Sequence, residues 1–192
     1  QVHLTGALVL YNNMLQSLFS SQIKTLGMVF AAIFIMLAIL FRKPLVAAIA
    51  LAPSMISASV VLGLMGFIGL PLDLMTITIA AITVGIAVDD SIHYIHRFSE
   101  ELQDRNSVTT AGADDQQRYD AAMARSHGSI GRAMYYTSIT IIAGFSILTL
   151  SNFLPTVYFG LLTGLAMATA LLANLTLLPA LLTRLRPTMP TP

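Results

Sequence analysis

The chain has 192 residues, of which 56% are hydrophobic and only 10% are charged, and its mean hydropathy is +0.78. An average soluble domain carries about a quarter charged residues, so this composition argues against a soluble globular protein. The formal net charge of +1 gives no reason to expect nucleic acid as a partner. The absence of cysteine excludes disulfides, thiolate metal sites and cysteine nucleophiles.

The first segment, residues 1–22, precedes the long apolar stretches. It lacks the basic start of a secretory signal, and the chain opens on Gln1 rather than on methionine. We therefore expect the sequence to be part of a longer protein. In that protein, residues 1–22 would be the tail of an extracytoplasmic domain.

Long uncharged stretches follow this segment. A helix needs about 20 apolar residues to cross the hydrocarbon core of a bilayer. The last stretch, residues 133–183, is too long for one crossing, and residues 152–155 divide it because proline cannot continue a helix. The sequence thus predicts an all-α bundle of five transmembrane helices, near residues 24–41, 45–68, 72–97, 133–152 and 156–183.

The Lys and Arg residues predict how the bundle is oriented. When alternate loops are assigned to alternate sides of the membrane, all of them except Lys24 fall on one side, which should be cytoplasmic. That side receives the loop 99–131 and the tail 187–192. A soluble helical protein would have no reason to sort its charges in this way.

The loop 99–131 contains a second predicted helix. Residues 117–127 have an amphipathic pattern, and we expect them to lie at the membrane interface with Tyr119, Ala122 and Met123 toward lipid. Neither this loop nor residues 1–22 contains an enzymatic motif.

The segment GIAVDDSIHYIHRF, residues 85–98, indicates the chemistry. Asp89 and Asp90 lie within the third predicted span, where a carboxylate costs at least a few kcal/mol and is usually tied to transport. Neighbouring carboxylates repel each other, so one of them holds a proton more readily than an isolated carboxylate would. In the alternative interpretation the span ends at Val88, but residues 74–88 would then extend only about 22 Å, too short to cross the membrane.

Helical spacing distributes the polar side chains of this segment over two neighbouring stripes. One carries Asp89, His93 and His96, and the other carries Asp90, Tyr94 and Arg97. We expect both stripes to face other helices and His93 to join the two aspartates in a proton relay. The alternative for either histidine is a simple hydrogen bond at the interface.

Partners for the aspartates must come from another helix, because Lys and Arg are absent from the interiors of the spans. The fourth span places hydroxyl groups at a similar depth, and we predict Thr137, Ser138 and Thr140 as relay partners. In the alternative, each hydroxyl bonds the backbone of its own helix. The sequence predicts no metal site and no cofactor other than the proton gradient.

Three motifs in order resemble the resistance-nodulation-division (RND) superfamily of proton-driven exporters, in its MMPL-type, hopanoid-transporter-like and Patched-like branch. GIAVDDSIHYIHRF is similar to the fourth helix of a family repeat, GRAMYYTSITIIAGFSILTLSNF to the fifth, and FGLLTGLAMATALLANLTLLPALL to the sixth. The opening VHLTGALVL resembles the end of the porter domain. The resemblance therefore covers nearly the whole chain.

This resemblance implies helices two to six of one six-helix repeat, by preference the C-terminal one, preceded at residues 1–22 by the tail of a porter-type domain. It assigns proton translocation to Asp89 and Asp90. The protein would then export hydrophobic or lipid-like molecules across a bacterial inner membrane. Its partners would be membrane lipids, the missing helices and porter domains of the same protein, and further copies in a homo-oligomer.

Two other functions compete with transport as interpretations of the sequence. The same five-helix block corresponds to the sterol-sensing domain of Patched relatives, so a lipid-binding regulatory module is the alternative. An intramembrane protease is disfavoured, because adjacent aspartates point about 100° apart on a helix, whereas a catalytic dyad faces itself across two helices.

Overall fold

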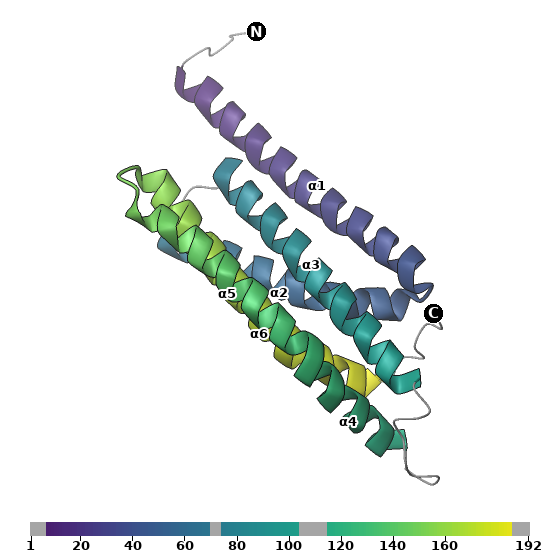
Figure 1. Ribbon diagram of the computed structural model, residues 1–192. Helices are drawn as coiled ribbons and strands as arrows, with labels where there is room; N and C mark the ends of the chain where they lie inside the picture. Colours follow the sequence, from purple (N-terminus) through teal and green to yellow (C-terminus); the bar gives the residue numbers. More distant parts are fainter. Residues whose placement is uncertain (1–6, 70–73, 104–114, 186–192) are drawn as a thin grey trace.

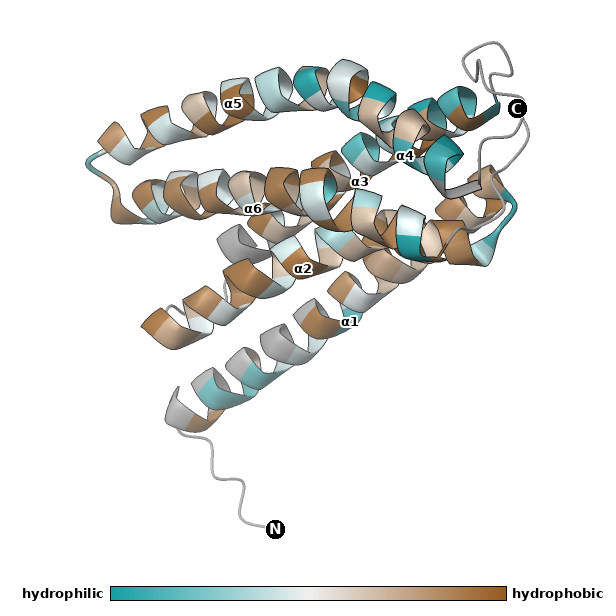
Figure 2. Ribbon diagram, turned by 90° about the horizontal axis from the view of Figure 1, so that it is seen from below, coloured by the Kyte–Doolittle hydropathy of each residue, from teal (hydrophilic) through white to brown (hydrophobic). Residues whose placement is uncertain are grey.

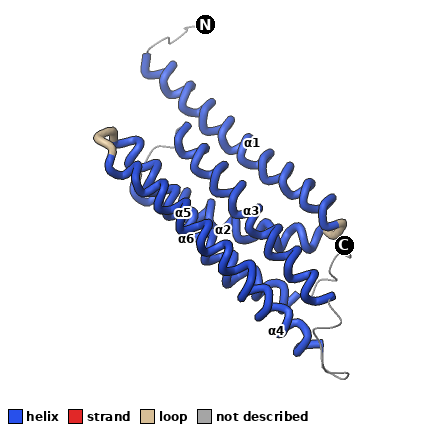
Figure 3. The backbone as a smooth tube through the Cα atoms, in the orientation of Figure 1, coloured by secondary structure: helices blue, strands red, loops and turns tan. Residues whose placement is uncertain are grey.

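The computed structural model describes residues 7–69, 74–103 and 115–185, and these form helices joined by short turns (Figures 1 and 3). Five of the helices are long and apolar enough to cross a membrane. The predicted all-α bundle with five transmembrane helices is therefore confirmed. Residues 1–6 of the predicted porter tail, the middle of the predicted loop and the tail 187–192 lie outside the described residues.

The α-helices are α1 (Ala7–Phe41), α2 (Pro44–Ile68), α3 (Leu74–Gln103), α4 (Asp115–Ser126), α5 (Arg132–Ile147) and α6 (Leu154–Leu185). A π-helical turn, η2 (His127–Gly131), joins α4 to α5, and the 3-10 turn η3 (Leu148–Leu150) follows α5. The candidate spans are Ile23–Phe41, Pro44–Ile68, Thr78–Gln103, Gln117–Leu150 and Leu154–Leu185.

Helix ends fall where the local residues favour them. Between α1 and α2, Arg42 has a positive φ of 53° and Lys43 is extended, and Pro44 then occupies the first helical position, where its missing N–H is no loss. Gly69 ends α2 in the left-handed conformation, with φ 74°, and its amide donates to the carbonyl oxygen of Gly66. The break predicted at residues 152–155 is where α6 begins, at Leu154.

The centre of the bundle is formed by α2, α3 and α6, each of which packs on the other two. Helix α5 lies along α6, and α1 lies at the edge against α2 (Figure 1). Ser57 of α2 donates a hydrogen bond of 2.6 Å to the carbonyl oxygen of Ala166 in α6. Hydrophobic residues cover most of the long helices, while hydrophilic residues gather on α4 and on the first half of α1 (Figure 2).

A very close helix contact occurs where α6 passes the end of α5. A Cβ atom added to Gly160 would lie 2.6 Å from the carbonyl oxygen of Phe145 and 2.8 Å from the Cβ of Leu148. Real Cβ atoms essentially never approach backbone so closely, so only glycine fits here. Four residues later, Gly164 makes only an ordinary van der Waals contact with Ile142.

Replacing Gly160 by valine should therefore separate α5 from α6. We expect the folded state to lose on the order of 1–3 kcal/mol, as in other overpacked cores. Gly164→Ala, with its looser surroundings, serves as the control and should change stability much less. The comparison is made by thermal unfolding in detergent, and equal midpoints for the two variants would contradict this packing.

The helix predicted at residues 117–127 is not a separate interfacial element. The chain runs from α4 through η2 into α5 as one continuous helix, and Ala122 is fully buried rather than directed to lipid. Tyr119 and Met123 are partly buried against the same core, and the ring centroids of Tyr119 and Phe98 are 5.9 Å apart. The prediction was wrong because α3 continues to Gln103, beyond the expected end at residue 97, and so offers α4 an apolar face to pack on.

Candidate functional site

The two aspartates lie on α3 and are directed to different surroundings. The Asp89 carboxylate is exposed and lies 3.6 Å from Nε2 of His93, one turn along the helix. Asp90 is half-buried. The structure therefore brings Asp89 and His93 together as predicted from their spacing and places Asp90 toward the bundle.

The two stripes of α3 also differ. Asp89, His93 and His96 all belong to a face that is uncovered in the described part of the chain. Gly85 continues this face. Among the described residues no helix covers this stripe, because α2, α6 and α4 pack on the remaining sides of α3, so the expectation that it faces another helix stays a prediction. The stripe with Asp90 faces inward in part, since Tyr94 is fully buried whereas Asp90 and Arg97 are half-buried.

A buried polar contact joins α3 to α6 beside Asp90. The hydroxyl of Ser91 lies 2.8 Å from Oδ1 of Asn174 and donates to it, and Nδ2 of Asn174 donates to the carbonyl oxygen of Ala87 at 3.2 Å. Ser91 and Asn174 are both fully buried. Sequence analysis missed this contact, although an asparagine inside the apolar motif that resembles the sixth helix was a usable signal, because buried amides need hydrogen-bond partners.

The predicted hydroxyl partners are mostly engaged in local bonds. Thr137 donates to the carbonyl oxygen of Ala133 at 2.8 Å, and Thr140 donates to that of Tyr136 at 2.9 Å. Both threonines are exposed, whereas Ser138 is buried. Helix α5 packs chiefly on α6 rather than on α3. The local bonds are those of the alternative interpretation, and a relay role for the three residues stays a prediction.

A second contact missed by sequence analysis links α3 to η2. The Tyr94 hydroxyl lies 3.2 Å from Nδ1 of His127, and the two rings meet edge to face with centroids 6.1 Å apart. His127 opens the π-helical turn, a departure from regular helix that is frequent at functional sites. No pattern of residues predicts a π-helical turn here, so the contact could not have been found from the sequence.

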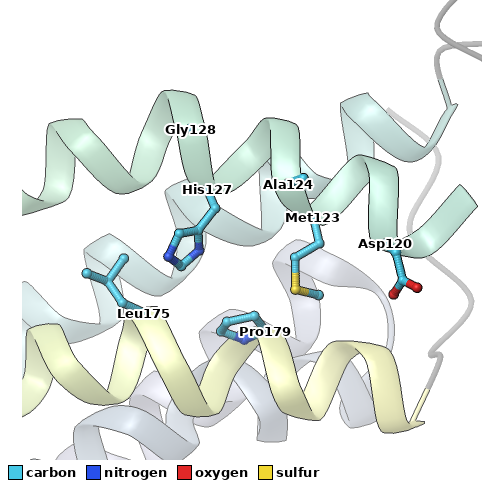
Figure 4. Close-up of a pocket in the computed structure, with 7 residues that line it drawn as sticks. All are labelled: Asp120, Met123, Ala124, His127, Gly128, Leu175 and Pro179. Carbon is cyan, nitrogen blue, oxygen red and sulfur yellow. The ribbon is translucent and has the colours of Figure 1, made fainter. Parts of the chain in front are cut away.

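His127 also lines a groove of about 590 Å³ between α4, η2 and α6. Its ring points from η2 toward α6, where Leu175 and Pro179 form the opposite wall (Figure 4). Met123 adds a further apolar side chain, and Asp120 lies at the far end of the labelled set (Figure 4). The groove is therefore apolar along most of its length, with a histidine and an aspartate as its polar groups.

Ion pairs connect the C-terminal ends of α3 and α4, beyond Tyr94 along α3. Glu101 of α3 accepts from Arg97 at 2.6 Å and from Arg125 of α4 at 2.8 Å, and its side chain is only 11% exposed. Among the described residues, no group of three His, Asp or Glu side chains is arranged to hold a metal ion.

The sequence profile of the MMPL family matches residues 1–190. The chain belongs to the MMPL family. The resemblance inferred from the three motifs is thereby confirmed at the family level. With its five apolar helices, this MMPL chain is an integral membrane protein that crosses the membrane several times.

Individual relatives agree with this assignment. The chain is 31% identical to membrane protein MJ1562 of Methanocaldococcus jannaschii over 82% of its length, which is 37% of that relative. It is 37% identical to the mycolic acid-containing lipids exporter MmpL11 of Mycolicibacterium smegmatis over 56% of its length, and 32% identical to transport protein MmpL11 of Mycobacterium leprae over 78%. The chain spans only 10% and 14% of these last two proteins.

Within this MMPL chain, the acidic segment of α3 can do proton chemistry. It combines an exposed carboxylate–imidazole pair, a half-buried carboxylate and a buried tyrosine hydroxyl within two helical turns. Carboxylates and imidazoles both exchange protons in the physiological range when their surroundings shift them.

Proposed function

We propose that this chain is the membrane-embedded part of an exporter of hydrophobic or lipid-like molecules, driven by the proton-motive force across a bacterial cytoplasmic (inner) membrane. Its C-terminus would be cytoplasmic. Membership of the MMPL family supports transport, and the name of the M. smegmatis relative supports a lipid-like cargo. The proton gradient is the energy source, so no cofactor is required.

The single observation that carries this proposal is the acid pair inside a membrane-spanning helix. Asp89 and Asp90 lie within the apolar span Thr78–Gln103. A charged carboxylate is much more costly in a membrane than a protonated one, so each proton gained or lost changes which surroundings α3 prefers. Protons thereby become a means of moving α3 against its neighbours.

The uncovered stripe of α3 requires a partner in the complete protein. Asp89 and His93 would be unfavourable against lipid, and small residues at Ala81 and Gly85 on the same face allow a helix to approach closely. We propose that the missing helices of the same protein, or another copy in a homo-oligomer, cover this stripe.

In the proposed cycle, protons from outside neutralise Asp89 and Asp90 and remove the repulsion between them. Helix α3 then shifts against α6, and this shift drives the extracytoplasmic domain. Release of the protons to the cytoplasm resets the helix. His93 takes part as the imidazole paired with Asp89, and Thr137, Ser138 and Thr140 remain proposed hydroxyl partners.

The test uses the full-length protein in proteoliposomes with a fluorescent phospholipid as cargo. We expect an imposed pH gradient to drive lipid movement and a protonophore to abolish it, because the energy source is then removed. Protein-free liposomes give the background rate. Saturable lipid binding that does not depend on the pH gradient would instead support the sterol-sensing alternative.

A further inference from the structure

The inward stripe of α3 continues from Asp90 to Tyr94, one turn closer to the Arg-rich end of the helix. Residues four apart on a helix are neighbours, with Cβ atoms about 5–6 Å apart. Tyr94 is fully buried, and its hydroxyl reaches His127 across the gap between α3 and η2. A polar connection therefore leads from the level of the acid pair out of α3.

His127 is the point at which this connection meets an open surface. Unlike Tyr94, it is exposed, and it lines the groove between α4, η2 and α6. The groove lies on the same side as Arg125 and the Glu101 ion pairs, which the charge distribution assigns to the cytoplasm. Its second polar group, Asp120, lies about two turns away along the helix, on α4.

We propose that Tyr94 and His127 form the cytoplasmic end of the proton path from Asp90. This inference rests on the proposed proton-driven function and adds the residues through which protons leave. The structure singles them out because a buried hydroxyl on the Asp90 stripe contacts an exposed imidazole in a groove.

Each proton transfer leaves Tyr94 unchanged. The proton released by Asp90 passes through water to the Tyr94 oxygen, while the hydroxyl proton of Tyr94 moves to Nδ1 of His127. The imidazole becomes an imidazolium and then loses the proton on Nε2 to water in the groove. Asp90 ends as a carboxylate and His127 returns to neutral, with its two nitrogens exchanged as donor and acceptor.

The other histidines of α3 are less suited to this role. His93 and His96 lie on the uncovered stripe, and His96 is 3.7 Å from Glu100 on its own helix. Neither is joined to a buried hydroxyl among the described residues. Protons on that stripe would enter the contact with the missing partner rather than an open groove.

The test measures how fast protons reach Asp90 from the cytoplasmic side. Inverted membrane vesicles carrying the full-length protein expose that side, and a membrane-impermeant caged proton outside them provides a sudden pH drop. Time-resolved infrared spectroscopy follows the carboxyl band that is absent from Asp90→Asn. The path is reversible, so proton arrival reports on it as well as proton release.

Two variants separate proton transfer from a merely structural contact. Tyr94→Phe keeps the ring but removes the hydroxyl, and His127→Asn keeps an acceptor oxygen near the Nδ1 position but cannot carry a proton. We expect both to slow the Asp90 signal at least about 100-fold, the lower end of the usual contribution of a positioned acid–base group. His96→Asn and Tyr135→Phe are matched controls and should keep the wild-type rate.

The outcomes are distinguishable. A wild-type rate in His127→Asn would overturn the path, because a structural hydrogen bond survives that substitution. The same holds if Tyr94→Phe is as fast as Tyr135→Phe. If no band assigned to Asp90 responds in the wild-type protein, the proton-driven function itself fails and the path fails with it.

Discussion

Replacing Asp89 and Asp90 together by asparagine should reduce gradient-driven lipid transport by at least about 100-fold, the order of effect of losing a positioned proton-transfer group. Asparagine has nearly the shape of aspartate, so the helix contacts remain, but an amide does not gain or lose a proton at physiological pH. The protein should still insert and fold. Transport is measured in the proteoliposome assay, with insertion checked by the yield of folded, purified protein.

The single variants refine this expectation. Asp89 is paired with His93 on the uncovered stripe, whereas Asp90 is half-buried and directly precedes Ser91 in the chain. If both carboxylates carry protons, each single variant should already be impaired. Glu100→Gln is the control, because this exposed acid lies at the end of α3 and should be dispensable. Undiminished transport in the double variant would refute the assignment of the pair.

Asn174→Asp should be among the most destabilising substitutions of α6, by about 3 kcal/mol or more, the range for leaving an unpaired charge buried. The new carboxylate would have nearly the shape of the amide, but the oxygen that replaces Nδ2 would face the carbonyl oxygen of Ala87, now 3.2 Å from the donor. While the carboxylate is ionised, the donated hydrogen bond becomes a repulsion in a fully buried place, and protonating it at neutral pH instead also costs free energy. Thermal unfolding in detergent measures the loss.

Asn174→Leu is the matched comparison. It removes the amide without introducing a charge, and Ser91 keeps the carbonyl oxygen of Ala87 as an acceptor at 2.9 Å. The expected loss is about 1 kcal/mol, typical of a hydrogen bond between membrane helices. Equal stability of the two variants would show that Asn174 is not confined to an enclosed, apolar environment.

The helical spans could be predicted because their causes are local. Pro44 begins a helix and residues 152–155 interrupt one, and both effects are encoded in the residues themselves. The course of α4 could not be predicted, because an amphipathic pattern fits either a lipid surface or a protein surface. The choice was decided by the length of α3, which supplies Phe98 as a partner for Tyr119.

The acid pair was equally accessible to sequence reasoning, since charged residues are rare in apolar spans. Spacing correctly paired Asp89 with His93 but could not show which stripe of α3 is covered. The contacts of Tyr94 with His127 and of Ser91 with Asn174 join residues 33 and 83 positions apart. Such pairs depend on how helices pack, which no local pattern reveals.

The ion pairs of Glu101 connect α3 to the helix that follows it in the chain. Helix α3 continues past the acid pair to Gln103, and Glu101 couples its end to Arg125 on a rod that runs without interruption from α4 into α5. A rotation of α3, or its displacement along its own axis, would thus also move the span Gln117–Leu150. Protonation of the acid pair inside the bilayer would then change the position of helix ends at the cytoplasmic surface.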